Sequence, residues 1–214
     1  MAAEKRCVII SASPEADIDF IRQNIQKDDY IICADGGLDT ALKASITPNL
    51  IVGDFDSVQN TEKFPQVETI SLEVRKMDTD TMHCVDVALE RGFSNFLLLG
   101  ATGGRTDHLL ANLSILIYLS NKKAYGKISD RYNDVTILRL GKNIVETPVG
   151  TTVSIIPFGD TFAEVSYKGM SYPLQKGIVK VEYPYTISNK TVTNNACITL
   201  HSGRALLIIV HAKY

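Results

Sequence analysis

The sequence predicts an α/β protein in which a parallel-sheet domain is followed by an all-β domain. In the first 120 residues, short apolar runs alternate with segments of helical period, the pattern of a parallel sheet covered by helices. From residue 135 onward only strand patterns appear, separated by Gly, Pro and Asn, as in a small sandwich or barrel. The polar segment 120–134 between them is a candidate linker. We therefore expect one domain over residues 1–130 and a second over 131–214.

The elements of the first domain follow from their apolar spacing and their end signals. Apolar runs that stop at turn residues predict strands at 6–11, 30–35, 49–54 and 95–100. Helical patterns predict helices at 14–25, 36–45, 79–92 and 105–120. Ser13 can cap the first helix with Pro14 in its first turn, and Gly92 can end the third.

The second domain contains apolar runs of strand length and shows no helical period. These runs are 135–140, 143–147, 151–158, 162–167, 177–183, 196–202 and 205–211. Several short strands at this spacing indicate a compact all-β fold.

The composition narrows the class of protein. The chain has 214 residues, 45% of them hydrophobic, and a net charge of −2, which predicts a globular protein without a basic surface for nucleic acid. Its apolar runs fall short of the roughly 20 residues that a membrane helix needs. The apolar run that follows its charged N-terminal residues is too short for a signal peptide. The four cysteines are scattered without a C-x-x-C pair, which favours free thiols in a reducing cytosol. We therefore expect a cytoplasmic protein that binds neither nucleic acid nor a membrane.

Aspartates gather where the strands of the first domain end or the next helix begins. They are Asp35, Asp54, Asp56, Asp78 and Asp80. One loop aspartate is usually a turn former or a helix cap, but the carboxyl ends of parallel strands share one edge, where ligands bind. Mutual repulsion makes such a cluster costly unless a cation neutralises it, and hard oxygen ligands favour Mg²⁺ or Ca²⁺. The four histidines are scattered and are expected to be structural or surface residues.

The stretch GATGGRTDH (100–108) suits a phosphate. Its glycines let backbone N–H groups approach an anion, and the stretch runs into the start of a helix. Arg105 adds a fork of donors that fits phosphate oxygens. The stretch is neither a Walker A loop nor a G-x-G-x-x-G fingerprint. Together with the acidic edge, it predicts a Mg²⁺–nucleoside phosphate site for phosphoryl or pyrophosphoryl transfer.

The same residues carry a resemblance to a known family. The ordered motifs are CADGG (33–37), GDFDS (53–57), TDTMHCVDVAL (79–89), GATGGRTDH (100–108) with Asn112 downstream, KGMSYPL (168–174) and ISN (187–189). In this order they resemble the thiamine pyrophosphokinase (thiamine diphosphokinase) family. The resemblance implies a Rossmann-like parallel-sheet domain that binds ATP, a C-terminal β-sandwich that binds thiamine, and a homodimer with shared active sites. It also implies transfer of the pyrophosphoryl group of ATP to the thiamine hydroxyl, which gives thiamine diphosphate and AMP.

The resemblance implies roles for individual residues of the first domain. Mg²⁺ and the ATP phosphates would be held by Asp54, Asp56 and Asp80. Toward the substrate, the same edge would carry Asp35 and Gly36. Phosphate would be contacted by Gly103, Gly104 and Arg105, and Asp107 would orient the nucleotide or the thiamine.

In the second domain, the resemblance implies thiamine contacts by Tyr172, Ser188 and Asn189, the last two in the neighbouring subunit's site. Tyr172 stands where the family often has tryptophan; an aromatic face suits a thiazolium cation, and a place in the β-domain core is the alternative. Met77 stands where the family is often acidic and cannot ligate Mg²⁺, so Asp78 is a candidate replacement. Two other functions stay open, a Mg²⁺-dependent phosphohydrolase with an Asp nucleophile and a non-enzymatic nucleotide-binding module.

Overall fold

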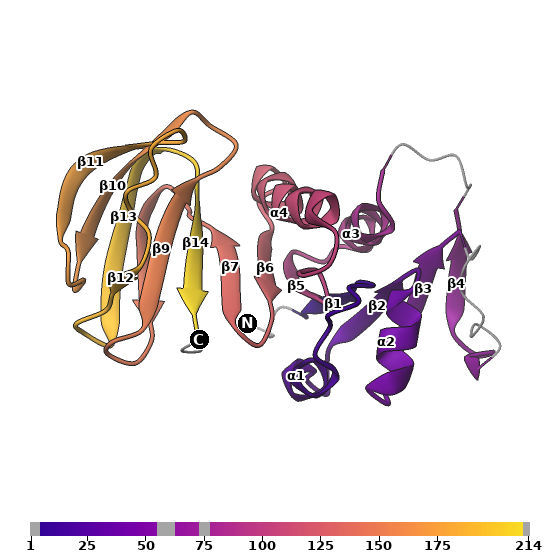
Figure 1. The fold of residues 1–214 in the computed structure, drawn as a ribbon. Coiled ribbons are helices and arrows are strands. Elements are labelled where there is room, and N and C mark those ends of the chain that lie inside the picture. Colours follow the sequence, from indigo (N-terminus) through magenta and orange to yellow (C-terminus); the bar gives the residue numbers. More distant parts are fainter. Residues whose placement is uncertain (1–4, 55–62, 73–77, 212–214) are drawn as a thin grey trace. The chain divides into compact units, whose positions relative to one another are not determined.

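The structure is a computed structural model that describes residues 5–54, 63–72 and 78–211. The chain divides into two compact units, Met1–Arg131 and Tyr132–Tyr214 (Figure 1). The mixed α/β class predicted from the sequence is confirmed. Within the described ranges, no helix is both long and apolar enough to cross a bilayer.

The first unit is built on parallel strands in the order β6-β5-β1-β2-β3-β4. Their bounds are β1 (Cys7–Ile10), β2 (Tyr30–Ala34), β3 (Leu50–Gly53), β4 (Glu68–Ser71), β5 (Asn95–Leu99) and β6 (Tyr125–Ser129). Every residue of β1 and β3 is buried, which explains their unbroken apolar sequences. The edge strand β4 is largely exposed and lacked an apolar signal, so the sequence did not predict it.

Within the part of the chain that the structure describes, α1 and α2 cover one face of this sheet and α3 and α4 cover the other (Figure 1). Their bounds are α1 (Ile18–Asn24), α2 (Gly37–Lys43), α3 (Asp80–Glu90) and α4 (Thr106–Asn121). On the α1 and α2 face, Ile21, Leu38 and Ala41 pack with the strands in one apolar cluster. The carboxyl ends of β1, β2 and β5 therefore lead into segments that connect to helices on both faces.

Two local predictions for this unit were wrong. The first helix begins at Ile18 and not near Pro14, because Asp17 is its N-cap and its carboxylate accepts a hydrogen bond from the Phe20 N–H at 3.0 Å. The polar segment expected to be a linker contains β6, which pairs with β5 in parallel. Gly126 in this strand lies against α4, where a Cβ atom would come 2.6 Å from Leu119 Cδ1, so the absence of a side chain permits close helix–strand packing.

The second unit consists of two antiparallel sheets that share one apolar core. One has the order β12-β9-β14-β7 and the other β11-β10-β13-β8. The bounds are β7 (Asn133–Ile137), β8 (Gly141–Glu146), β9 (Thr152–Pro157), β10 (Phe162–Lys168), β11 (Leu174–Lys180), β12 (Asn189–Lys190), β13 (Asn195–Gly203) and β14 (Ala205–Val210). On β10, the alternate residues Ala163, Val165 and Tyr167 point into the core.

Each of the expected apolar runs in this unit overlaps an observed strand, with one clear shift. The run expected at 177–183 belongs to β11, which ends at Lys180. It ends there because the chain turns back, and the Tyr183 N–H donates to the Lys180 carbonyl at 3.0 Å. The short strand β12 had no recognisable sequence signal, since it has only two residues.

Candidate active site

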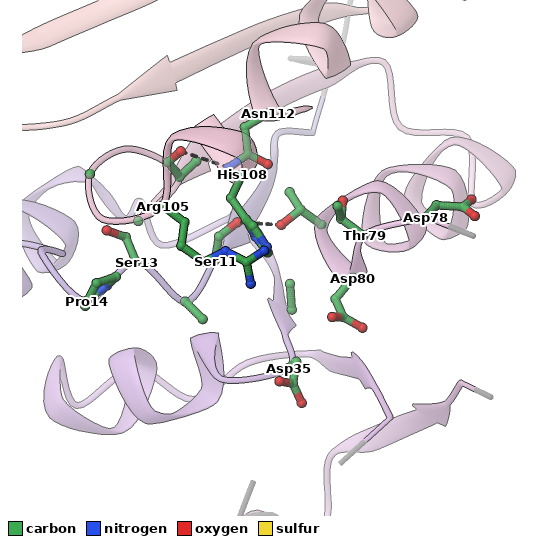
Figure 2. Close-up of a pocket in the computed structure, with 16 residues that line it drawn as sticks. Ser11, Ser13, Pro14, Asp35, Asp78, Thr79, Asp80, Arg105, His108 and Asn112 are labelled. Atoms are coloured by element: carbon green, nitrogen blue, oxygen red, sulfur yellow. Dashed lines mark hydrogen bonds between the residues drawn. The ribbon is translucent and has the colours of Figure 1, made fainter. Parts of the chain in front are cut away.

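A cavity of about 370 Å³ lies at the carboxyl ends of the parallel strands (Figure 2). The chain passes outward from β1 to β4 and then returns to β5 on the other side of β1, so the strand order reverses between β1 and β5. Open α/β sheets bind ligands at such a switch point. The cavity is lined by Ser11, Ala12, Ser13, Pro14, Ala34, Asp35, Asp78, Thr79, Asp80, Thr81, Gly100, Ala101, Gly103, Arg105, His108 and Asn112.

Three of the predicted aspartates lie in this cavity. Asp35 follows β2, while Asp78 and Asp80 flank the beginning of α3. The α3 N-terminus is fixed by Thr79, whose hydroxyl accepts a hydrogen bond from the Met82 N–H at 3.2 Å. Asp35 adopts a φ of 42°, a left-handed conformation that few residues other than glycine and Asx tolerate. The acidic side of the cavity is therefore built from a tight turn and a capped helix start.

The opposite side of the cavity is formed by the glycine-rich stretch and the first turns of α4. Figure 2 shows Arg105 and His108 on the α4 side, across from Asp35 and Asp80. Gly103 and Gly104 have φ values of 84° and 65°, and a Cβ atom at Gly104 would approach the Pro14 ring to 2.8 Å. Both positions need glycine, because the stretch folds back tightly onto the segment that follows β1.

Arg105 and Asp107 form a two-point ion pair at the beginning of α4. Arg105 Nε donates to Asp107 Oδ1 at 3.1 Å, and Arg105 Nη2 donates to Asp107 Oδ2 at 2.6 Å. The hydrogen bonds from Arg105 lower the pKa of Asp107 to about 2. Arg105 lines the cavity and Asp107 does not. In this geometry the Asp107 carboxylate orients the Arg105 guanidinium. Arg105 Nη1 takes no part in the ion pair.

The deep wall of the cavity is fixed by two buried hydrogen bonds, both visible in Figure 2. The hydroxyls of Ser11 and Thr81 lie 3.0 Å apart and join the end of β1 to the first turn of α3. Asn112 Nδ2 donates to the Ala101 carbonyl at 2.8 Å and joins α4 to the glycine-rich stretch. Elements that are distant in the sequence are thus held together around the site.

Other predicted residues of the first unit lie outside the cavity lining. Asp54 follows β3 and is half-buried, and Gly36 precedes α2 as its N-cap residue. Asp56 and Met77 lie outside the described residues, so the structure does not place them. Among residues 5–54, 63–72 and 78–211, no three His, Cys, Asp or Glu side chains gather closely enough to hold a metal ion.

In the second unit, two of the predicted thiamine residues, Tyr172 and Asn189, are hydrogen-bonded to each other. The Tyr172 side chain is exposed (74%), so its alternative assignment to the β core is wrong. Asn189 is buried, and its side-chain amide is hydrogen-bonded to the backbone of Tyr172. Its Oδ1 accepts from the Tyr172 N–H at 3.0 Å, and its Nδ2 donates to the Tyr172 carbonyl at 2.9 Å. Ser188 is exposed, and its N–H donates to Ser154 Oγ at 2.9 Å.

Sequence reasoning missed several residues of the first cavity, His108 above all. It was expected to be a structural or surface histidine, yet it lines the cavity with Arg105 and Asn112. The spacing of these three residues, i, i+3 and i+7, places them on one face of a helix that begins at a glycine-rich stretch. That periodicity was the available signal. Ser11 carried no comparable signal, because a serine at a strand end is common.

Comparisons with known proteins find the same family for both units of the chain. Residues 21–127 match the family described as thiamin pyrophosphokinase, catalytic domain, and residues 142–205 match its vitamin B1 binding domain. The thiamine pyrophosphokinase of Bacillus subtilis is 27% identical over 183 residues, which cover 83% of this chain and 85% of the relative. A crystal structure of the Bacillus subtilis enzyme covers 98% of this chain and 100% of its own, with a TM-score of 0.88 at 25% identity. The thiamin pyrophosphokinase structure from Geobacillus thermodenitrificans covers 97% and 98%, with a TM-score of 0.85 at 27% identity. The chain belongs to the thiamin pyrophosphokinase family.

Proposed function

We infer that this chain transfers the pyrophosphoryl group of ATP to the hydroxyl of thiamine and releases thiamine diphosphate and AMP. The observation that carries this inference is the cavity at the β1–β5 switch point, which sets acidic side chains opposite Arg105 within the match to the catalytic domain. In the reaction the thiamine oxygen forms a bond to the β-phosphorus, and the bond between that phosphorus and the AMP oxygen breaks. The alternative, a Mg²⁺-dependent phosphohydrolase, is not favoured, because matches to both thiamin pyrophosphokinase domains are present.

We propose that the first unit, residues 1–130, binds ATP and that residues 131–214 bind thiamine. The parallel sheet with helices on both faces supports a Rossmann-like description of the first domain. The two antiparallel sheets on a common core support a β-sandwich description of the second. The match of residues 142–205 to a vitamin B1 binding domain supports the thiamine assignment.

For the metal, we propose Mg²⁺ held by Asp54, Asp56 and Asp80. Carboxylate oxygens are the ligands that Mg²⁺ prefers, and Asp80 already faces the cavity, so the donor chemistry fits. Asp78 also lines the cavity and can replace the acidic residue that Met77 lacks. When bound, Mg²⁺ supplies charge neutralisation at the phosphate oxygens.

For ATP, we propose that Arg105 and the backbone of Gly103 and Gly104 bind the phosphates. The α4 N-terminus and a guanidinium together favour an anion at this side of the cavity. Asp107 contributes through Arg105, whose guanidinium it holds in one orientation. Asp35, with Gly36 beside it, lies toward the substrate at the acidic side.

For thiamine, we propose contacts by Tyr172 and Ser188, with Asn189 bracing Tyr172. An exposed aromatic face is available for a thiazolium cation, which the negative face of the ring attracts. We further propose a homodimer whose subunits share active sites. Large apolar side chains exposed on the second unit, such as Ile144, Ile178 and Tyr183, support an interface there. A cytoplasmic location stays a prediction from the sequence.

The reaction is tested by measuring AMP release from ATP with and without thiamine. We expect AMP formation to depend on thiamine. Release of AMP or phosphate at the same rate with and without thiamine would contradict the proposal and favour a hydrolase.

Asp56→Ala is expected to abolish turnover at saturating Mg²⁺ while the unfolding temperature is unchanged. The matched control is Asp28→Ala, which removes an exposed aspartate near the amino end of β2 and is expected to keep full activity. Sedimentation that shows an active monomer would exclude the shared-site dimer.

A further inference from the structure

The glycine-rich stretch 100–104 forms hydrogen bonds with three other segments of the chain. The Gly100 carbonyl accepts from the Ser13 N–H at 3.0 Å. The Ala101 carbonyl accepts from Asn112 Nδ2 at 2.8 Å. Thr102 Oγ1 donates to Asp130 Oδ2 at 2.8 Å. Residues 100, 101 and 102 are therefore each held by a hydrogen bond, immediately before Gly103, Gly104 and Arg105.

Among these three bonds, the one from Asn112 comes from a residue inside a helix. Asn112 lies near the middle of α4, is 6% exposed, and donates across the cavity wall to a carbonyl on a residue that is 4% exposed. A buried amide that lacked this bond would leave both its own N–H and the carbonyl without compensation for lost water. The geometry thus has little freedom to change while α4 stays folded.

Fixing one carbonyl fixes the neighbouring amide as well. The peptide between Ala101 and Thr102 is planar and trans, so its C=O and N–H point in opposite directions. While Asn112 holds the Ala101 carbonyl, the Thr102 N–H cannot rotate, and the glycines that follow start from a fixed peptide plane. A phosphate that binds to backbone N–H groups gains most when these groups are already oriented.

We propose that Asn112 is a positioning residue for ATP, which holds the stretch 100–104 in the shape that receives the phosphates. The proposal rests on the proposed function, in which Gly103, Gly104 and Arg105 contact the phosphates. Asn112 acts through the Ala101 carbonyl and not by a reacting atom of its own. It therefore affects the binding of ATP and leaves the binding of thiamine to the separate thiamine unit.

The main test is the isosteric change Asn112→Asp, which replaces the donor by a carboxylate of the same size. We expect the KM for ATP and the ATP Kd measured by calorimetry without thiamine to rise about tenfold, since a buried carbonyl loses its partner. The KM for thiamine is expected to stay within about twofold. Asn112→Ala provides a second variant with the same expected direction, in case a buried carboxylate prevents folding. Asn112→Gln keeps a carboxamide donor and is expected to recover part of the ATP affinity.

Two further variants make the outcomes decisive. Ser114→Ala removes another side-chain hydrogen bond of α4, from Ser114 Oγ to the Leu110 carbonyl, and is expected to leave both KM values unchanged. Arg105→Ala tests the phosphate site itself and should weaken ATP binding strongly. If Arg105→Ala weakens ATP binding while folded Asn112→Asp and Asn112→Ala bind ATP normally, the positioning role is wrong and the phosphate site stands. If Arg105→Ala also binds ATP normally, the phosphate site is wrong and the positioning role falls with it. An equal rise of KM for both substrates in the Asn112 variants would indicate general damage and overturn the inference.

Discussion

Asn189 offers the sharpest test of the thiamine side, because its amide makes three backbone hydrogen bonds. Its Oδ1 accepts from the N–H groups of Tyr172 and Lys190 at 3.0 and 2.9 Å, and its Nδ2 donates to the Tyr172 carbonyl at 2.9 Å. Asn189→Ala removes all three. With about 1 kcal/mol for each bond, the free energy of unfolding is expected to fall by up to about 3 kcal/mol, and by less where water reaches the freed groups.

The same change is expected to weaken thiamine binding. If thiamine must restore about 1.4 kcal/mol of lost order at Tyr172, its KM rises about tenfold, while the KM for ATP stays near the wild-type value. The assay is AMP release as a function of thiamine concentration, together with urea unfolding. Because Asn189 acts through Tyr172, Tyr172→Ala and the double variant should show nearly the same thiamine KM.

Asn143 provides the matched control. Its Oδ1 accepts from the Arg139 N–H at 3.0 Å, and its Nδ2 donates to the carbonyls of Arg139 at 2.8 Å, Gly141 at 3.1 Å and Ile198 at 3.4 Å, so its amide, like that of Asn189, binds backbone groups of the same unit. Asn143→Ala is expected to lower stability without a change in the KM for thiamine. The reasoning is refuted if folded Asn189→Ala keeps a wild-type thiamine KM, or if Asn143→Ala raises it equally.

Three further outcomes are expected. Gly104→Ala places a Cβ atom 2.8 Å from the Pro14 ring at a φ of 65°, so it should raise the KM for ATP severalfold. The control is Gly150→Ala, which is also at positive φ but has open space around it and should leave the KM for ATP unchanged. Equal KM values for ATP in the two variants would contradict this prediction. Because pairing with Arg105 lowers the pKa of Asp107 to about 2, the stability that the pair contributes is present above about pH 4 and is lost as the pH falls toward 2. Asp107→Asn should therefore flatten that part of the acid-unfolding curve, and an unchanged curve would argue against the pair. Asp29→Ala leaves the partly buried Arg6 without its two-point partner and should lower the unfolding free energy by about 3–5 kcal/mol, measured in urea, with both KM values unchanged.

Local sequence signals predicted strands β1, β2, β3 and β5 of the parallel sheet, because each of these strands is a short apolar run. The runs 30–35 and 49–54 became β2 (Tyr30–Ala34) and β3 (Leu50–Gly53), and turn residues follow both. The helix start at Ile18 was missed because Ser13-Pro14 and Asp17 are both plausible caps, and only the hydrogen bond to Phe20 distinguishes them. Strand β6 was missed because its burial comes from contact with α4 and β5, which a polar local sequence does not reveal.

The two halves of the site differ in how far the sequence could describe them. On the ATP side, Asp35 directly follows β2, Arg105 follows β5 after a short glycine-rich stretch, and Asp80 begins α3, so the order of strands and helices in the chain brings all three to one edge of the sheet. On the thiamine side, the contact between Tyr172 and Asn189 depends on the pairing of segments 169–172 and 188–192, which is fixed by bonds such as Ser171 N–H to the Lys190 carbonyl at 2.8 Å. No local pattern encodes that pairing. A family motif could therefore indicate that Asn189 matters, but only the fold shows that its amide is already engaged by the backbone. For this reason its expected effect on thiamine is indirect and should disappear once Tyr172 is removed.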